Sequence, residues 1–553
     1  MAKLTGAKII MECLLEQDVD TIFGYPGGQI MPLYDALYDY TSDGRINHVL
    51  TSHEQGATHA ADGYARSTGK VGVCFATSGP GATNTVTGIA TANIDSSPLV
   101  VITGQVPISS LGKDSFQEVD IVGVTLPIVK HSFACRDVED LAETVRLAFK
   151  IAKSGRPGPV LIDVPKDLLV TKASYKKEER VTVDPAPPVE IEKIEKLAEY
   201  INNSEKPVIY AGGGVTISNA SQELTQLAEK SQIPVATTLM CLGNFSRKSP
   251  LSLGMAGMHG EKDSNMAVHN CDLLITIGAR FSDRVTGNPE TFAKHAKVIH
   301  IDIDRSEVGK NIGVDYKVIG DVKCILKELV PLVSENQRKE WNKQVRSWKR
   351  TFDDPINFDP DMIFKTVNEK LGDDVIVATD VGQHQMWTAQ KWPFTKPRKL
   401  ITSGGLGTMG FGLGAAIGSQ LANPDQRVIL FTGDGSFRMN CNELMTVASQ
   451  NLPIIVFVLK NNTLGMVRQW QKLFFNKRYS ATDLSDVVDY KKLCEAFGLN
   501  GWEVDNENDL KKAIDEAVAT KKGAVIACDI YIDENVWPIV PPGDSISNQV
   551  TEE

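Results

Sequence analysis

Short apolar runs rich in β-branched residues alternate with helix-like segments along the whole chain. The clearest runs are VGVCFATSG, PLVVITGQ, PVLIDVP, PVIYAGGG, LLITIGA, VIHIDID, VIVATDVG, RVILFTGDG and PIIVFVL. Such alternation is typical of parallel sheets that are covered by helices. Many runs end in Gly, Asp, Thr or Ser, and ligands gather at the carboxyl edge of such sheets. The sequence therefore predicts an α/β protein with binding sites at its strand ends.

Two polar stretches interrupt this alternation, KASYKKEERVTVDPAPPVEIEK and SENQRKEWNKQVRSWKRTFDDPINFDPD. Both carry the charges and prolines that are typical of linkers. A chain of 553 residues is also too long for one hydrophobic core. We therefore expect three doubly wound parallel-sheet domains, followed by a tail: residues 1–175, 185–345 and 355–535, then 536–553.

Composition narrows the class of partner and compartment. The formal charge of −11 argues against a nucleic-acid partner, because such proteins use clustered Lys and Arg. The nine cysteines are scattered singly, which indicates free thiols in a reducing compartment, and we expect a cytoplasmic protein. The start, MAKLTGAKIIMECLLEQ, predicts a helix rather than a secretion signal. No run approaches the roughly 18 apolar residues of a membrane span, so no membrane association is expected.

The stretch from Phe431 to Asn462 predicts a site for magnesium and a diphosphate. RVILF and LPIIVFVL predict adjacent parallel strands, joined by a helix over CNELMTVASQ, with Gly433 and Gly435 allowing a sharp turn around Asp434. The crossover would bring Asp434 near Asn461 and Asn462. One carboxylate with amide and carbonyl oxygens can hold Mg2+ together with a phosphorylated ligand. Gly435 and Ser436 could offer amides to the phosphates.

Other interpretations of these glycine motifs stay open at this point. GDG alone is equally typical of a plain turn, and NN of a helix cap. GLGTMG, from Gly405 to Gly410, matches the dinucleotide-binding pattern literally. It follows only a weak strand, however, and lacks a suitable acid at the expected distance, so we discount the dinucleotide interpretation.

Glu54 begins a helix that is unusually rich in Gly and Ala, within TSHEQGATHAADGYARSTG. Small side chains permit close packing against another element. A carboxyl group in such an apolar pocket is suited to shuttle a proton, whereas an exposed one would only stabilise the helix N-terminus. His53 and His59 lie roughly 120° apart around a helix, which excludes the zinc-protease pattern.

Many motifs in order resemble the catalytic large subunits of the acetohydroxyacid synthase (acetolactate synthase) family of thiamine diphosphate enzymes. They are GYPGG, SHEQGATHAADGYAR, TSGPGATN, TGQVP, FQEVD, SGRPGPVLIDVPKD, GMHG, GARFSDRVTGN, VGQHQMW, GGLGTMGFGLGAAIG, GDGSF and GMVRQWQ. The resemblance spans almost the whole chain. It implies pyrimidine-binding, FAD-binding and diphosphate-binding domains in that order, with thiamine diphosphate, Mg2+ and FAD as cofactors. The implied reaction decarboxylates pyruvate and joins the two-carbon unit to pyruvate or 2-ketobutyrate, in branched-chain amino acid biosynthesis.

The resemblance also implies site residues. Catalytic roles fall on Glu54, Gln117 and Lys166, although a surface loop and a solvated lysine are the plain interpretations of the last two. The thiamine diphosphate set is Glu54, Gly382, Gln383, His384, Gly407, Met409, Gly435, Ser436 and Met466. The FAD set is Arg156, His259, Gly260, Gly278, Ala279, Arg280, Asp302 and Asp321. The second-substrate pocket is formed by Phe116, Met466 and Trp470.

Two positions depart from the family pattern. Counting back from LGMVRQWQ places the family's magnesium-binding asparagine on Asn461 and a carbonyl ligand on Thr463, beside Asp434, and leaves Asn462 as a bystander. Lys460 stands where the family has its other asparagine. Gly414 replaces a proline, which would loosen the start of its helix.

The resemblance further implies partners. A homodimer is the minimum, with a tetramer as the larger alternative, because the glutamate helix of one subunit faces the diphosphate domain of the other. A regulatory small subunit is expected too. The rival functions are pyruvate oxidase, glyoxylate carboligase and an inactive assembly subunit. Glu54 argues against the carboligase, and an intact set of Glu54, Asp434 and Asn461 argues against the inactive subunit.

Overall fold

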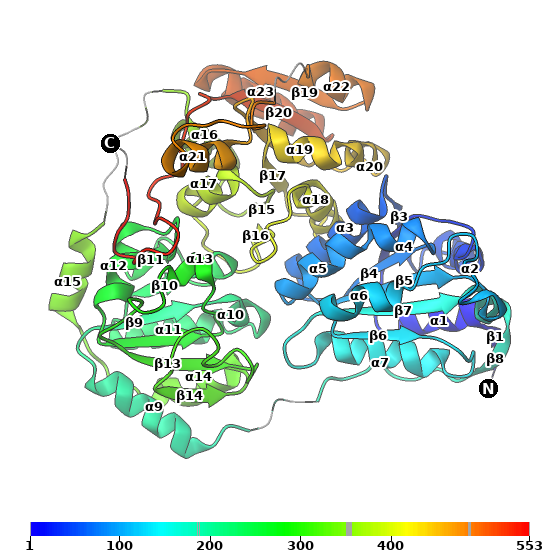
Figure 1. The fold of residues 1–553 in the computed structure, drawn as a ribbon, viewed down its shortest axis with the longest axis horizontal. Helices are drawn as coiled ribbons and strands as arrows, with labels where there is room; N and C mark the ends of the chain where they lie inside the picture. Colours follow the sequence, from blue (N-terminus) through cyan, green and yellow to red (C-terminus); the bar gives the residue numbers. More distant parts are fainter. Residues whose placement is uncertain are drawn as a thin grey trace.

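The computed structural model describes residues 2–184, 186, 188–349, 355, 357–484 and 488–551. Three six-stranded parallel sheets, each flanked by helices, form three α/β domains, as the sequence predicts. In Figure 1 the N-terminal domain (blue to cyan) and the central domain (green) lie side by side beneath the C-terminal domain (yellow to red). The boundary residues of the domains stay a prediction, and parts of both expected linkers lie outside the described residues.

The first sheet has the strand order β3-β2-β4-β5-β7-β6. Its strands are β2 (Thr21–Gly24), β3 (Asn47–Leu50), β4 (Gly72–Ala76), β5 (Leu99–Gln105), β6 (His131–Ala134) and β7 (Pro159–Pro165). The helices are α1 (Gly6–Glu16), α2 (Met31–Ser42), α3 (Glu54–Thr68), α4 (Pro80–Asn84), α5 (Val86–Ile94), α6 (Ile121–Thr125), α7 (Leu141–Lys153) and α8 (Lys166–Val170). A small antiparallel sheet pairs β1 (Ala2–Thr5) with β8 (Lys172–Tyr175).

The second sheet has the strand order β11-β10-β9-β12-β13-β14. Its strands are β9 (Pro207–Ala211), β10 (Val235–Thr237), β11 (Ser252–Met255), β12 (Leu273–Ile277), β13 (Lys297–Asp302) and β14 (Tyr316–Ile319). The helices are α9 (Ile191–Asn203), α10 (Gly213–Ile217), α11 (Ser221–Ser231), α12 (Lys262–Asn270), α13 (Asp283–Thr286), α14 (Val322–Leu332) and α15 (Lys339–Ser347). The order reverses between β9 and β12, as in the dinucleotide-binding fold.

The third sheet has the strand order β16-β15-β17-β18-β20-β19 and so repeats the topology of the first. Its strands are β15 (Ile376–Thr379), β16 (Leu400–Ile401), β17 (Val428–Gly433), β18 (Ile455–Lys460), β19 (Asn500–Val504) and β20 (Ala524–Asp529). The helices are α16 (Pro360–Leu371), α17 (Gln383–Lys391), α18 (Phe411–Ala422), α19 (Asp434–Asn440), α20 (Leu444–Ser449), α21 (Gly465–Phe474), α22 (Tyr490–Ala496) and α23 (Glu507–Thr520).

Every strand predicted from an apolar run forms, but one local prediction is wrong. Asp434 does not lie in a turn between a strand and a later helix; it is the first residue of α19 itself. The helix predicted over CNELMTVASQ is a 3-10 turn (Cys441–Glu443) followed by the short α20. Because Gly433 ends β17 in an extended conformation, strand and helix join directly, and the carboxylate lies at the helix start.

Helices α3 and α18 pack against each other at backbone distance and join the N-terminal and C-terminal domains. A Cβ on Gly63 would lie 2.1 Å from the carbonyl oxygen of Ala415, and one on Gly418 would lie 1.8 Å from that of Ala60. Gly414 lies in the same contact, where a Cβ would be 2.8 Å from the Cβ of His59. The glycine at position 414 therefore serves close helix packing, and α18 runs unbroken from Phe411.

The C-terminal segment after β20 crosses back to the central domain, where it lies beside α12 and α13 (Figure 1). The N–H of Val540 donates to the carbonyl of Met258, and the carbonyl of Asp544 accepts from Asn288. Ile546 is buried among central-domain side chains. All nine cysteines are free thiols. Within the described ranges, no helix combines the length and the apolar character that a membrane crossing requires.

Candidate functional site

Asp434 and the asparagine pair meet at the carboxyl edge of the third sheet. Asp434 Oδ2 accepts the N–H of Asn462 at 2.6 Å, and Oδ1 accepts the N–H of Gly435 at 3.0 Å. Asp434 is 1% exposed and Asn461 is 6% exposed. The parallel register of β17 and β18 holds the two strand ends level, and the predicted juxtaposition therefore forms.

The oxygen atoms around Asp434 are suitable ligands for a hard cation, which prefers oxygen. Asn461 Nδ2 donates to Gln383 Oε1 at 3.3 Å, and Asn461 Oδ1 accepts the N–H of Thr463 at 3.3 Å. The Oδ1 of Asn462 is buried without a hydrogen-bond partner. That Asn462 takes no part in metal binding stays a prediction. A single carboxylate with amide and carbonyl oxygens leaves octahedral positions for phosphate oxygens on Mg2+. In the part of the chain that the structure describes, no group of three His, Cys, Asp or Glu could hold a metal.

His384 lies at the point where the strand order of the third sheet reverses, between β15 and β17. A Cβ on Gly433 would lie 2.9 Å from its Nδ1, and its Nε2 is buried without a partner. Burial lowers the pKa of His384 to about 3, so the imidazole is neutral near pH 7. Ser436 Oγ donates to the carbonyl of Val381 at 2.9 Å, beside Gly382. These groups form a buried polar edge suited to an anionic phosphate.

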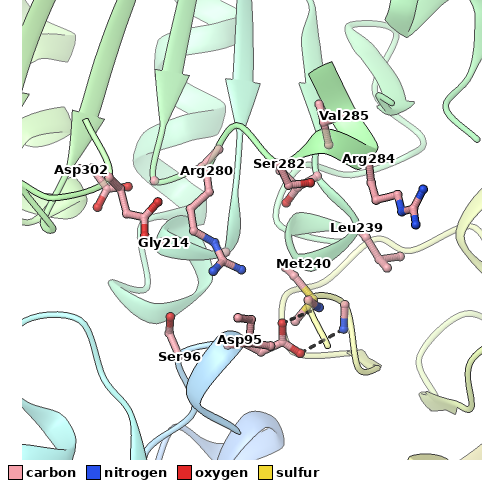
Figure 2. Close-up of a pocket in the computed structure, with 18 of the residues that line it drawn as sticks. Asp95, Ser96, Gly214, Leu239, Met240, Arg280, Ser282, Arg284, Val285 and Asp302 are labelled. Atoms are coloured by element: carbon pink, nitrogen blue, oxygen red, sulfur yellow. Dashed lines mark hydrogen bonds between the residues drawn. The ribbon is translucent and has the colours of Figure 1, made fainter. Parts of the chain in front are cut away.

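The loop that carries Gly407 and Met409 is held by the N-terminal domain. Asp95, which follows α5, accepts the N–H groups of Gly404 and Gly405 at 3.0 and 2.8 Å (Figure 2). Arg66 of α3 donates to Asp95 at 3.0 Å. Gly407 adopts a left-handed conformation with φ 71°. Asp95 and Arg66 were missed by sequence reasoning, because nothing local marks a contact that spans more than 300 residues.

Arg66 makes a buried ion-pair network beneath this loop. It forms two hydrogen bonds to Asp62, at 2.7 and 2.8 Å, and one to the carbonyl of Thr402 at 2.8 Å. The side chains of Asp62 and Asp95 have no exposed surface. The three charges therefore lock α3 and α5 to the start of the glycine-rich loop.

The other predicted catalytic residues gather at the carboxyl edge of the first sheet. Glu54 is the first residue of α3, is 9% exposed, and accepts a hydrogen bond from Asn84 Nδ2 at 2.9 Å. A Cβ on Gly81 would lie 3.1 Å from Glu54 Oε1. Asn84 belongs to the motif TSGPGATN, but only the fold reveals that it orients the glutamate.

Gln117, Phe116 and Lys166 lie on the same edge. A Cβ on Gly79 would lie 2.8 Å from the carbonyl oxygen of Gln117, so the loop of Gln117 rests on the turn that leads to α4. Gln117 itself has φ 60°, a strained conformation for a side-chain-bearing residue. Phe116 is 83% exposed. Lys166 begins α8, directly after β7.

A cavity of about 2890 Å³ opens where the three domains meet. It is lined by all predicted FAD residues except Gly260, which lies just behind His259 and donates its N–H to Gly257. The part of its wall that the C-terminal domain contributes includes Gly382, Gly407, Met466 and Trp470. Drug-sized ligands occupy roughly 300–1,000 Å³, so this space suits something much larger.

The strand ends at the reversal of the central sheet form a glycine cradle on this cavity. Gly214, which follows β9, donates its N–H to Gly278, which follows β12 with φ 56°. A Cβ on Gly214 would lie 2.7 Å from Gly278 Cα. Asp302 ends β13, and burial raises its pKa to about 6. Figure 2 shows Gly214, Arg280 and Asp302 on one side of the cavity. Glycine backbone can approach a pyrophosphate closely, and a buried carboxylate beside it can accept hydrogen bonds from a ribose.

Three further features of the cavity wall were missed in the sequence or predicted only in part. Arg284, within the motif GARFSDRVTGN, places its guanidinium 5.5 Å from the ring centre of Trp470. Arg156 is paired with Glu307 at 2.8 Å and with Asp304 at 3.4 Å. Gly214 and Met240 also line the cavity, although only a run of glycines and an isolated methionine would have marked them in the sequence.

The predicted catalytic residues of the first sheet do not join this cavity. Among the described residues that line it, Glu54, Phe116, Gln117 and Lys166 are absent. Asp434, Asn461 and Thr463 are absent from its lining as well. The Glu54 edge of the first sheet and the Asp434 edge of the third sheet are called the two half-sites below.

Three family models match the chain in order. They describe thiamine pyrophosphate enzymes: the N-terminal TPP binding domain over residues 4–124, the central domain over 194–329 and the C-terminal TPP binding domain over 380–528. The acetolactate synthase large subunit of Parasynechococcus marenigrum (strain WH8102) is 46% identical over 565 residues, covering 99% of this chain and 91% of the relative. The acetolactate synthase isozyme 2 large subunit of Escherichia coli (strain K12) is 45% identical, covering 99% of each. The probable acetolactate synthase large subunit of Methanococcus aeolicus is 44% identical, covering 99% and 95%.

Proposed function

The chain belongs to the acetolactate synthase large subunits, a family of thiamine pyrophosphate-dependent transferases. From this premise we propose that it decarboxylates pyruvate and joins the two-carbon unit to pyruvate or 2-ketobutyrate. The products would be 2-acetolactate and 2-aceto-2-hydroxybutyrate, in branched-chain amino acid biosynthesis. The observation that carries the proposal is the buried pairing of Asp434 with the Asn461–Asn462 segment at one strand edge.

We assign the diphosphate end of the cofactor to the edge of the third sheet. Mg2+ would be held by Asp434, Asn461 and the carbonyl of Thr463. Gly382, Gln383, His384, Gly435 and Ser436 would surround the phosphates. Support comes from the buried carboxylate of Asp434, the unpartnered Nε2 of His384 and the absence of side chains at the glycines. Bound thiamine diphosphate supplies a carbon nucleophile and an electron sink, which together permit loss of carbon dioxide from a 2-ketoacid.

Glu54 would hold a proton at the pyrimidine ring of the cofactor. Its burial at the helix start and its hydrogen bond from Asn84 support this role, since a proton shuttle needs a fixed carboxyl group away from bulk water. Gly407 and Met409 would support the pyrimidine from the other side. Gln117 and Lys166 would orient the substrate carboxylate.

The complete site would form between two copies of the chain. Gly382, Gly407 and Met466 line the cavity and Glu54 of the same chain does not, which supports a contribution from a partner subunit. Exposed apolar side chains near both edges, Phe116, Leu126 and Met439, would become buried in such a homodimer. A tetramer is the larger alternative. The relatives are named large subunits, which supports a separate regulatory small subunit. Nine free cysteines favour the cytoplasm.

We assign the cavity to FAD. The strand order of the central sheet, the Gly214–Gly278 cradle and Asp302 support this assignment. Trp470 and Met466, with Phe116 from the partner subunit's half-site, would shape the second-substrate pocket.

The testing experiment is an assay of acetolactate formation from pyruvate, with and without added FAD and with 2-ketobutyrate in competition. The proposal requires acetolactate without consumption of an electron acceptor. Reduction of a dye by pyruvate would favour the oxidase instead, and a lack of product under all conditions would favour an inactive subunit.

A further inference from the structure

Glu443, in the C-terminal domain, lies at the N-terminus of the helix that Glu54 begins. Its two carboxylate oxygens accept the N–H of Ser52 at 3.2 and 3.1 Å. Ser52 Oγ donates to the carbonyl of the neighbouring Asn442 at 2.9 Å. The contact bridges nearly 400 residues of sequence, and no local pattern announces it.

The carboxylate of Glu443 is fully buried and hydrogen-bonded at both oxygens. It is 0% exposed, and its Oε2 accepts a hydrogen bond from Thr446 Oγ1 at 2.6 Å. A Cβ on Gly56 would lie 2.1 Å from Glu443 Oε1, so α3 has a glycine where the carboxylate enters. Burial raises the pKa of Glu443, while Thr446 and the N–H of Ser52 oppose that rise. A buried side chain with this many donors is held for a structural or functional reason.

The position of Glu443 in the chain connects the two half-sites. α19 begins at Asp434 and continues into the 3-10 turn that ends at Glu443. α19 and α20 lie directly above α3 and β3 in Figure 1. The segment that begins with the proposed magnesium ligand thus ends on the helix that begins with the proposed proton carrier. The N-cap of α3 is His53, whose side chain accepts the N–H of Gln55, and Glu443 holds the residue just before this cap. The positive end of the helix dipole favours an anionic group at this place.

We propose that Glu443 is a positioning residue, which fixes the first turn of α3 and thereby the carboxyl group of Glu54. The inference rests on the proposed function of Glu54. Loss of the Glu443 contact frees the N–H of Ser52 and lets the first turn of α3 fray. Glu54 is then held by Asn84 alone, and its proton transfer slows. The missing side chain of Gly56 leaves room for this carboxylate. The added methyl group of Gly56→Ala would displace the carboxylate and so disturb the same contact.

The first test measures backbone protection without cofactor. In hydrogen–deuterium exchange of the apoprotein, the peptide spanning residues 52–60 of Glu443→Ala should exchange about tenfold faster than wild type, since the lost hydrogen bonds to Ser52 release the residue before the N-cap, with an effect similar to that of a lost cap. Glu443→Gln, which keeps an acceptor oxygen, should restore wild-type protection. Unchanged exchange in Glu443→Ala overturns the proposal.

The second test measures the proton relay directly. With thiamine diphosphate bound, exchange of the thiazolium C2 proton, followed by quenched NMR, should slow by at least about tenfold in Glu443→Ala and Gly56→Ala, because small misplacements of a catalytic group cost this much or more. Glu443→Gln should recover most of the rate. Equal C2 exchange in wild type and Glu443→Ala contradicts the proposal.

The matched control is Asp359, which caps α16 in the same domain by accepting the N–H of Met362 at 2.9 Å. Asp359→Ala should cost comparable thermal stability but leave both exchange rates unchanged. If Asp359→Ala slows C2 exchange as much as Glu443→Ala, general destabilisation explains the effect and the proposal is wrong. If Glu443→Ala does not fold, Glu443→Asp, whose carboxylate is withdrawn by one methylene, must show the same two changes.

Failure of this inference can be told from failure of the proposed function. If wild type forms acetolactate and Glu54→Gln does not, the proposed function stands whatever Glu443 does. If wild type forms no acetolactate, the proposed function fails, while the apoprotein exchange result still decides whether Glu443 fixes α3.

Discussion

The backbone N–H of Asn462 donates to Asp434 Oδ2 across 2.6 Å, joining the ends of two adjacent parallel strands. This bond fixes the carboxylate beside the amide oxygens that would complete a magnesium site. Asp434→Ala should therefore weaken Mg2+-dependent retention of thiamine diphosphate by at least about tenfold, because a carboxylate is the only charged ligand in the set. Calorimetric titration of the cofactor at several Mg2+ concentrations checks this.

The control for Asp434 is Asp529, which ends β20 on the same edge and pairs with Lys460 at 3.1 Å. Asp529→Ala should leave cofactor retention as in wild type. Equal retention by Asp434→Ala and wild type would remove Asp434 from the metal site.

Removing the carboxyl group of Glu54 should separate binding from turnover. Glu54→Gln should bind thiamine diphosphate normally, since the phosphate contacts lie elsewhere, but kcat should fall by at least about a hundredfold, the usual contribution of general acid–base catalysis. Asn84→Ala, which removes the hydrogen bond to Glu54, should give a smaller fall in kcat with unchanged cofactor affinity. Near-normal turnover of Glu54→Gln would refute its role.

The raised pKa of Asp302 predicts that the affinity for the flavin depends on pH. Its pKa is raised to about 6 by burial, so the anion that accepts ribose hydroxyl groups is lost as the pH falls through about 6. Flavin retained after gel filtration should therefore decrease between about pH 8 and about pH 5, and Asp302→Asn should lack this step. His259, whose pKa burial lowers to about 4, titrates below this window.

In the protein without flavin, the ionisation of Asp302 should affect the free energy of unfolding in the opposite direction. Its folded-state pKa near 6 lies above the ordinary value of 3.8, so the folded state binds the proton more tightly. The free energy of unfolding contributed by Asp302 therefore rises as the pH falls from about 6 towards about 4. A pH-independent flavin content in wild type would contradict the role of Asp302.

Arg66 should be needed for the joining of the N-terminal and C-terminal domains. Arg66→Ala leaves Asp62 and Asp95 buried without their cation, and such losses cost about 3–5 kcal/mol. The thermal unfolding midpoint should fall clearly. Lys8→Ala, which breaks an exposed pair with Asp39, should cost at most about 1 kcal/mol. Similar midpoints for the two variants would mean that the network does not stabilise the fold.

The sequence predicts the fold well because apolar strands buried on both faces leave a strong local signal. VILFT and IVFVL form β17 and β18 as expected, and the βαβ crossover rule correctly brings Asp434 to Asn462. The contacts that join domains leave no such signal. Asp95 on Gly404, Arg66 on the carbonyl of Thr402 and Glu443 on Ser52 all involve ordinary polar residues, whose role depends on the approach of distant segments in the fold.

The start of α19 fails in prediction for a related reason. Gly, Asp and Ser are turn residues by local preference, yet Asp434 starts a helix because its carboxylate and the strand end of Asn462 hold each other. The glycines of α3 were correctly interpreted as marks of close packing, but only the structure identifies α18 as the partner helix.

A mixing experiment tests most directly whether the active site spans two chains. Glu54→Gln and Asp434→Ala should each be nearly inactive alone. When the two variants are mixed, denatured mildly and allowed to reassociate, a heterodimer contains one site with Glu54 and Asp434 both intact. Acetolactate formation should then recover to about a quarter of wild type, as expected for random pairing of a two-fold symmetric dimer. No recovery, despite heterodimers detected by mass spectrometry, would contradict a site built from the Glu54 edge of one chain and the Asp434 edge of another.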